Sequence, residues 1–137
     1  GVQTCALPIY MLQAMNTGHD GSLSTGHANS TEDMLSRLET MVLQGAAGLP
    51  LEAIRQQIAS AVDIIIHLSR LRDKSRKTME ITEVVGYVNG KIILNPLYVF
   101  EEDEKSTLEK VSGKLKRTDN KMQNTFKLKL SGFKSEI

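Results

Sequence analysis

The sequence predicts an α/β fold, because helical and strand patterns follow one another along its 137 residues. Residues 31–44 and 51–62 each place their apolar side chains along one face of a helix. After these, β-branched runs begin at Ile64, and Asn89-Gly90 is a dipeptide that favours a two-residue hairpin turn. A chain of this length is enough for one domain of modest size.

The helical part has recognisable boundaries. A first helix is expected over Tyr10–Asn16, ended by Gly18, and a short strand over Gly21–Thr25. Asn29 or Ser30 can cap the helix over 31–44, and Pro50 is expected to open the helix over 51–62, at a position where a missing N–H costs nothing. The apolar faces of these two helices are core candidates: Met34, Leu35, Leu38, Met41 and Val42, then Leu51, Ile54, Ile58, Ala61 and Val62.

The sheet begins where the helical period stops. Ile64-Ile65-Ile66 is continuous and β-branched, which predicts a strand buried on both faces. A charged turn over 70–77 precedes two strands, Met79–Val88 and Ile92–Phe100, which are expected to pair antiparallel across the Asn89-Gly90 turn. Pro96 puts part of the second strand at an edge or a bulge.

The charges are unevenly distributed. Nine Lys and Arg stand against three Asp and Glu in residues 105–137, whereas residues 1–104 carry a net charge of −5. The acidic run Glu101–Glu104 is interpreted as a solvated linker. The expected organisation is therefore a body over 10–101 and a basic tail over 102–137, with a final helix over Lys121–Leu130 whose apolar residues recur every four positions.

A polar loop over Gly18–Ser30 is the main candidate for function, because it has small hydroxyl and amide side chains and two of the three histidines. His19, Asp20 and His27 lack diagnostic metal-ligand spacing, and no metal site is expected. The chain contains no Gly-x-x-x-x-Gly-Lys-Ser/Thr motif, so it encodes no phosphate-binding loop. The single cysteine, Cys5, excludes an internal disulfide.

Several motifs together resemble a known family. The stretch Ser24-Thr25-Gly26-His27-Ala28-Asn29-Ser30 is similar to the histidine box of that family, and the stretch before it, Met11–Ser22, is similar to the family as well. The likeness continues through Arg37–Met41, Ile54–Ala61, Ser69–Asp73 and Ile81–Gly86. These stretches, over about residues 10 to 101, resemble the tight-adherence (Flp) pilus-assembly ATPases, the CpaF branch of the type II/IV secretion ATPases. Lys74 stands where that family commonly has a turn glycine. Residues 1–9 resemble the translated end of a sequencing adapter, which predicts that they are an artefact.

The resemblance implies the C-terminal part of a RecA-like P-loop ATPase domain, with a partial sheet, flanking helices and a C-terminal β-hairpin. Such proteins are hexamers that use ATP and Mg²⁺ to drive pilus assembly or secretion with inner-membrane platform proteins. They are cytoplasmic and peripheral to the bacterial inner membrane. The Walker A and Walker B motifs would lie upstream, so this chain alone is expected to be inactive.

The resemblance also implies roles for single residues. Thr25 and His27 are expected near the γ-phosphate as catalytic groups. Arg70 and Arg72 are expected at the nucleotide or at a subunit interface, with a solvated surface turn as the equal alternative.

A second hypothesis makes the chain a non-enzymatic α/β interaction module whose basic tail binds acidic lipid or nucleic acid. Binding of nucleic acid is not expected, because no aromatic residues alternate with the basic ones in the tail. The two hypotheses differ in whether a phosphate-binding loop and a Walker B acid precede this chain in the intact gene.

Overall fold

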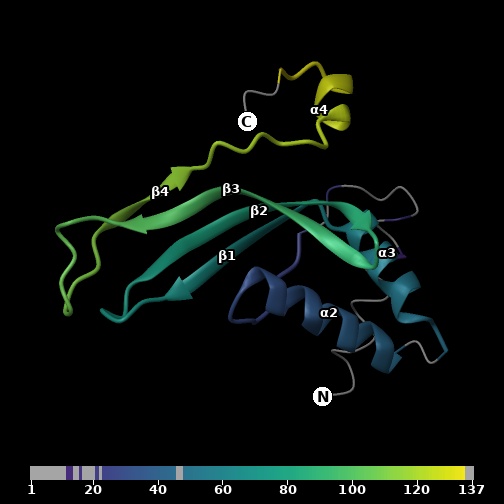
Figure 1. Cartoon of the computed structure of the whole chain (residues 1–137), viewed down its shortest axis with the longest axis horizontal. Helices are drawn as coiled ribbons and strands as arrows, with labels where there is room; N and C mark the ends of the chain where they lie inside the picture. Colours follow the sequence, from purple (N-terminus) through teal and green to yellow (C-terminus); the bar gives the residue numbers. More distant parts are fainter. Residues whose placement is uncertain (1–11, 14–15, 17–20, 22, 46–47, 135–137) are drawn as a thin grey trace. The chain divides into compact units, whose positions relative to one another are not determined.

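The computed structural model describes residues 12–13, 16, 21, 23–45 and 48–134. The chain forms two compact units: one holds residues 1–63 and 86–93, and the other holds residues 64–85 and 94–137. Figure 1 shows the helices and strands from which they are built. The expected adapter segment over residues 1–9 and the expected helix stop at Gly18 lie outside the described residues.

The first unit is helical, as predicted. Helix α2 spans Thr31–Gly45 and α3 spans Leu51–Ala61, and Leu12, Gln13 and Asn16 are helical as well. Burying a large aliphatic side chain stabilises a fold by about 1.5–3 kcal/mol, so the apolar faces hold this unit together. Its most buried aliphatic residues come from both helices and from the helical residues before them: Leu12, Leu35, Leu38, Val42, Ile54 and Ile58.

Two details of this unit bear on the sequence prediction. Pro50 is the N-cap of α3, with φ −62° and ψ 144°, so it lies just outside the helix, which begins at Leu51 as predicted. The strand predicted over Gly21–Thr25 is wrong for the described residues, which have no strand there. A strand needs a hydrogen-bonded neighbour, and the sheet of the described residues consists only of four other strands.

The sheet has strand order β1-β2-β3-β4. Strand β1 spans Ile64–Arg70 and pairs antiparallel with β2, Arg76–Val88. Strand β3, Lys91–Glu102, follows β2 through a turn in which Asn89 has φ 51° and Gly90 has φ 82°. These left-handed values are those of a type I′ turn, so the predicted hairpin is confirmed. Strand β4, Gly113–Arg117, pairs antiparallel with β3 and was not predicted.

Strand β1 is not buried on both faces, which corrects the interpretation of Ile64–Ile66. Its side chains alternate between exposed and half-buried, and Ile66 and Leu68 are 56% and 62% exposed. Successive side chains of a strand point to opposite faces of the sheet, so this alternation shows that one face of β1 is exposed to solvent. Pro96 fits its predicted edge position, because β4 pairs with β3 only from Tyr98 onward.

The first half of the acidic run, Glu101 and Glu102, belongs to the sheet and not to a linker. Glu101 and Glu102 end β3, where Glu101 pairs with Lys116 of β4 at 2.8 Å. The tail therefore returns to the sheet directly after the loop 103–112. Joining the sheet gives the backbone of residues 113–117 its hydrogen-bond partners.

The last helix is shorter than predicted. Helix α4 spans Phe126–Leu130 only. In the predicted helix Lys121 O would accept from Thr125 N–H, but here it accepts from Asn95 Nδ2 at 2.9 Å, and Thr125 N–H donates to Gln123 O. The helix ends in a Schellman motif, in which Phe133 N–H donates to Leu128 O and Gly132 N–H to Lys129 O. Gly132, with φ 82°, supplies the left-handed residue that this motif requires.

The turn between β1 and β2 holds a non-glycine residue in the left-handed region, since Lys74 has φ 66°. That conformation costs about 1–2 kcal/mol for a residue with a Cβ. Glycine would remove this cost, but its larger conformational entropy in the unfolded state offsets about half of the gain in stability. We therefore expect Lys74→Gly to raise the free energy of unfolding by about 0.5 kcal/mol, measured by chemical denaturation. Lys74→Ala, which keeps the Cβ, is the control and should give no such gain.

Candidate functional site

The predicted catalytic residues lie in one loop, residues 23–30, which we call the histidine loop. It leads directly into α2, and Ser30 caps that helix by accepting a hydrogen bond from Asp33 N–H at 3.1 Å. Arg37, one turn into α2, donates a hydrogen bond to the backbone carbonyl of His27. Gly26 lies against Met34, so closely that an added Cβ would be 2.6 Å from Met34 Cε. The loop is thus attached to α2 at three points.

Thr25 and His27 are both exposed. The hydrogen bond from Arg37 uses the backbone carbonyl of His27, and the His27 side chain is on the surface of the first unit. An imidazole in that position can donate or accept a hydrogen bond toward a phosphate oxygen or a water molecule. The loop backbone is held by α2, and the candidate side chains Thr25 and His27 are exposed, as is common for binding residues on loops.

Arg72 belongs to the second unit and forms a clamp there. Its guanidinium binds both carboxylate oxygens of Glu102, at 2.7 and 2.8 Å, and donates twice to Thr107 O, at 3.1 and 2.8 Å. These bonds join the β1–β2 turn to the end of β3 and the loop after it. They also lower the pKa of Glu102. Arg70 ends β1, opposite Arg76, and is exposed.

Asp73 forms a second link between the same segments. Oδ1 accepts hydrogen bonds from Ser75 N–H at 3.0 Å and from Ser75 Oγ at 2.5 Å, and Oδ2 accepts one from Val111 N–H at 2.9 Å. The bonds from the Ser75 hydroxyl and from Val111 N–H lower the pKa of Asp73 from 3.8 to about 2. The turn over 71–75 is therefore bonded to the loop 103–112 through a carboxylate that stays ionised in mild acid.

The lowered pKa of Asp73 predicts that part of the free energy of unfolding depends on pH in the acid range. A folded pKa below the unfolded one stabilises the fold above about pH 4, and this contribution is lost as the pH falls toward about 2. We expect Asp73→Asn to be less stable than the wild type at neutral pH, and the difference to shrink between those two values. Urea denaturation of both proteins across this range measures it. A difference that is constant with pH would contradict the assignment.

Glu83 is a buried carboxylate that the sequence prediction did not single out as a separate feature. It is 1% exposed, and its donors are Asn95 Nδ2 at 2.8 Å, Gln123 N–H at 3.0 Å and Asn124 N–H at 2.8 Å. Burial alone would raise the pKa of Glu83, but the hydrogen bonds from Asn124, Asn95 and Gln123 together lower it. The Asn124 side chain also donates to Val85 O at 2.9 Å. We call this arrangement the Glu83 anchor, since it fastens residues 121–124 to the sheet.

The described residues do not form a site for a metal ion. No group of three or more His, Cys, Asp or Glu in the described ranges could hold a metal ion. These residues therefore do not by themselves fit Mg²⁺. None of the helices in the described part combines the length and apolarity that a membrane crossing needs.

Comparison with known proteins identifies the class. Residues 7–129 match the family model described as "Type II/IV secretion system protein", and the chain belongs to this family. Three relatives show its range. A putative conjugal transfer protein of Mycobacterium tuberculosis is 35% identical over 82 residues, 60% of this chain and 22% of the relative. The conjugal transfer protein TrbB of Rhizobium radiobacter is 32% identical over 93 residues, 68% of this chain and 27% of the relative.

The third relative is similar over a shorter stretch. The type IV secretion system protein VirB11 of Brucella suis is 43% identical over 54 residues, 38% of this chain and 15% of the relative. The chain thus spans between 15% and 27% of the length of these three relatives. The type II/IV secretion part of the predicted resemblance is confirmed.

Proposed function

We propose that this chain is the C-terminal part of the motor domain of a secretion ATPase, which hydrolyses ATP to drive assembly or transport. The family match over residues 7–129 carries the proposal. The exposed histidine loop in front of a capped helix supports it. The motor domain is RecA-like, and the Walker A and Walker B motifs belong to the upstream part of the parent protein.

The proposed catalytic groups are His27 and Thr25. In the parent protein the upstream phosphate-binding loop holds ATP with Mg²⁺, and the metal supplies charge neutralisation for the phosphates. The His27 imidazole and the Thr25 hydroxyl then position the γ-phosphate or the attacking water by hydrogen bonds. Catalysis of phosphoryl transfer consists largely of such positioning and of charge stabilisation.

Arg70 and Arg72 are unequal candidates for contact with nucleotide or a neighbouring subunit. Arg72 uses its fork of donors on Glu102 and Thr107, which supports a structural role in the turn. Arg70 is exposed at the end of β1. We assign the outward contact to Arg70.

The particular system that we propose is the Flp pilus, with a CpaF-type hexamer that lies in the cytoplasm against the bacterial inner membrane and works on platform proteins. The motifs from Met11 to Gly86 support this choice, whereas two of the relatives described above are named for conjugal transfer. Deleting the parent gene separates the two possibilities. Loss of surface pili with normal conjugation is the expected result, and loss of conjugation with normal pili would contradict the Flp assignment.

Oligomeric state and activity test the motor itself. We expect the purified full-length parent to form a hexamer in light scattering and to hydrolyse ATP. A parent protein without a phosphate-binding loop and without turnover would favour the alternative, a non-enzymatic interaction module. The exposed basic tail is the observation that supports this alternative.

A further inference from the structure

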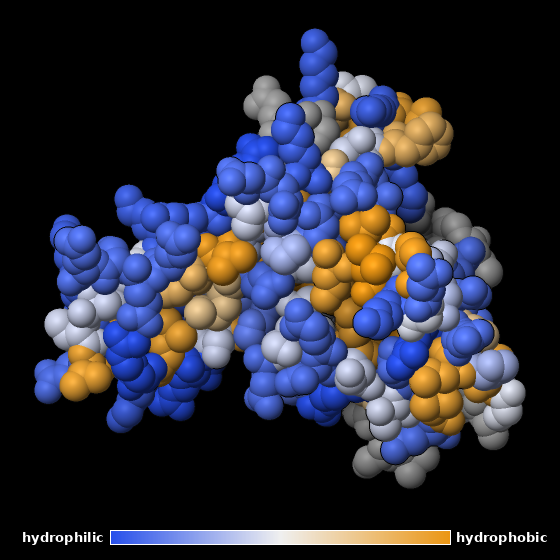
Figure 2. Space-filling view, in the orientation of Figure 1, coloured by the Kyte–Doolittle hydropathy of each residue, from blue (hydrophilic) through white to orange (hydrophobic). Residues whose placement is uncertain are grey.

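The segment 121–134 leaves most of its large apolar side chains in solvent. Phe126, Leu130 and Phe133 are 72%, 72% and 66% exposed. Phe126 and Leu130 stand four residues apart on one face of α4, and the Schellman motif brings Phe133 back beside that helix. Figure 2 shows orange atoms beside blue ones over the C-terminal segment. Exposed apolar groups that gather in this way mark an interaction surface.

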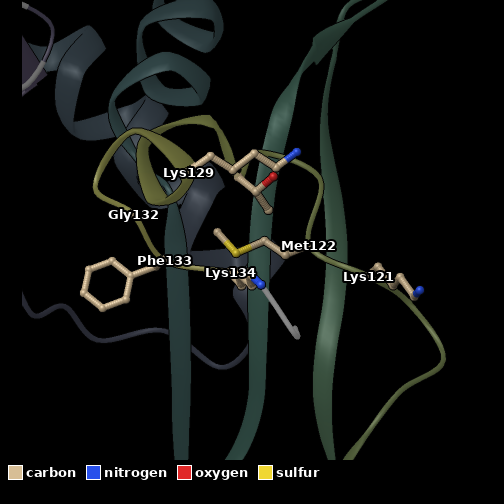
Figure 3. Close-up of a pocket in the computed structure, with 7 residues that line it drawn as sticks. Lys121, Met122, Lys129, Gly132, Phe133 and Lys134 are labelled. Carbon is tan, nitrogen blue, oxygen red and sulfur yellow. The ribbon is translucent and has the colours of Figure 1, made fainter.

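The charge of the segment is of one sign. Between Lys121 and Lys134 the sequence has four lysines and no acidic residue. Lys121, Lys129 and Lys134 line an open pocket of about 500 Å³ together with Met122 and Phe133. In Figure 3 Phe133 and Lys121 extend from the loop in opposite directions. The partner of this surface is therefore negatively charged and accepts apolar side chains.

Hydrogen bonds to the sheet hold the base of this segment in place. The Glu83 anchor binds Gln123 and Asn124, and Asn95 Nδ2 donates to Lys121 O at 2.9 Å. These bonds fix the base of the segment on the sheet, while α4 and Phe133 point their apolar groups outward. A fixed surface loses less conformational freedom on binding than a loose tail does.

We propose that residues 121–134 bind the surface of a membrane that contains anionic phospholipids. The lysines meet the phosphate headgroups, and Phe126, Leu130 and Phe133 enter the boundary between headgroups and acyl chains. A second copy of the same surface would bring lysines against lysines, and nucleic acid offers no apolar layer for the leucine. The inference rests on the proposed location at a membrane and does not require ATP turnover.

The chain allows a clean optical test, because it contains no tryptophan. In Phe133→Trp the new indole is the only one, and its emission should shift to the blue with vesicles of phosphatidylcholine and phosphatidylglycerol, but not with phosphatidylcholine alone. The matched control is Leu108→Trp, at a site that is 88% exposed and outside the segment. It should show no shift with either vesicle. Equal shifts in both variants, or none in Phe133→Trp, would overturn the proposal.

Vesicle flotation tests the lysines. Each lysine near an anionic surface contributes about a fivefold factor in affinity, so Lys121→Gln, Lys129→Gln and Lys134→Gln together should weaken binding about a hundredfold. Lys105→Gln, Lys110→Gln and Lys114→Gln remove the same charge outside the segment and should have a much smaller effect. Equal losses of vesicle affinity in the two triple variants would show a general charge effect and overturn the proposal. Binding to a single-stranded oligonucleotide without binding to vesicles would overturn it as well. Because flotation needs no nucleotide, an inactive parent that still binds vesicles would refute the motor and leave this inference standing.

Discussion

His27→Ala in the intact parent protein should lower ATP turnover on the order of 10²-fold and change nucleotide affinity little. A group that acts on the γ-phosphate or the attacking water contributes mainly in the transition state, so its loss appears in kcat. The structure adds a reason to expect a stable variant. Arg37 binds the backbone carbonyl of His27, and alanine keeps that carbonyl.

His27→Asn is the matched control, because its amide keeps one donor near the position of a ring nitrogen. If the imidazole acts on the phosphate, His27→Asn should stay well below wild-type turnover at an unchanged melting temperature. If His27 only orders the loop, His27→Asn should restore stability and turnover together. Normal turnover in His27→Ala would end the catalytic assignment.

Glu83→Ala should lower the free energy of unfolding by about 3 kcal/mol. Glu83 is buried, and its removal leaves the donors of Asn95, Gln123 and Asn124 without their acceptor. Hydrogen bonds to a charged group contribute about 1.5–3 kcal/mol each, and a buried donor without a partner costs about as much. The expected loss is smaller than the sum of the three hydrogen-bond contributions, because water partly reaches the donors that lose their acceptor. Urea denaturation of the chain measures the loss.

Glu101→Ala is the control for this substitution, since Glu101 forms an exposed pair with Lys116. Removing an exposed pair costs about 0–1 kcal/mol. Hydrogen exchange gives a second readout, because the amides of Gln123 and Asn124 should lose protection in Glu83→Ala but not in Glu101→Ala. Equal stability of the two variants would show that the Glu83 anchor contributes little.

Local patterns in the sequence predicted much of this fold. The helical period predicted α2 and α3 to within about one residue at each end, because an amphipathic helix can be recognised from the spacing of its own apolar residues. The Asn89-Gly90 turn was predictable for the same reason, since the two residues carry the left-handed conformation by themselves. The cap at Ser30 likewise depends on a residue three positions away.

Features that depend on distant residues were missed. Strand β4 forms because Gly113–Arg117 pairs with the end of β3. The sequence of these five residues alone does not predict a strand. The helix predicted from Lys121 begins only at Phe126, because Lys121 O accepts from the side chain of Asn95, 26 positions earlier in the chain. Burial of β1 on both faces was wrong because a β-branched run records strand preference, whereas burial depends on what lies beside the strand.

The candidate site divides in the same way. The histidine loop was found from its residues, and its position before a capped helix was expected. The clamp of Arg72 on Glu102 and Thr107 was not, because it joins segments about 30 residues apart. Glu83 had one visible signal, an acidic residue inside an otherwise apolar strand pattern, Ile81-Thr82-Glu83-Val84-Val85.

The most direct test of the central claim compares ATP turnover by the purified full-length parent with turnover by the purified 137-residue chain. The chain has no phosphate-binding loop, so the β- and γ-phosphates lack their backbone donors and lysine. The account predicts turnover by the parent and none by the chain above the level of a mock purification. Turnover by the chain, or a parent that hydrolyses no ATP, would contradict it.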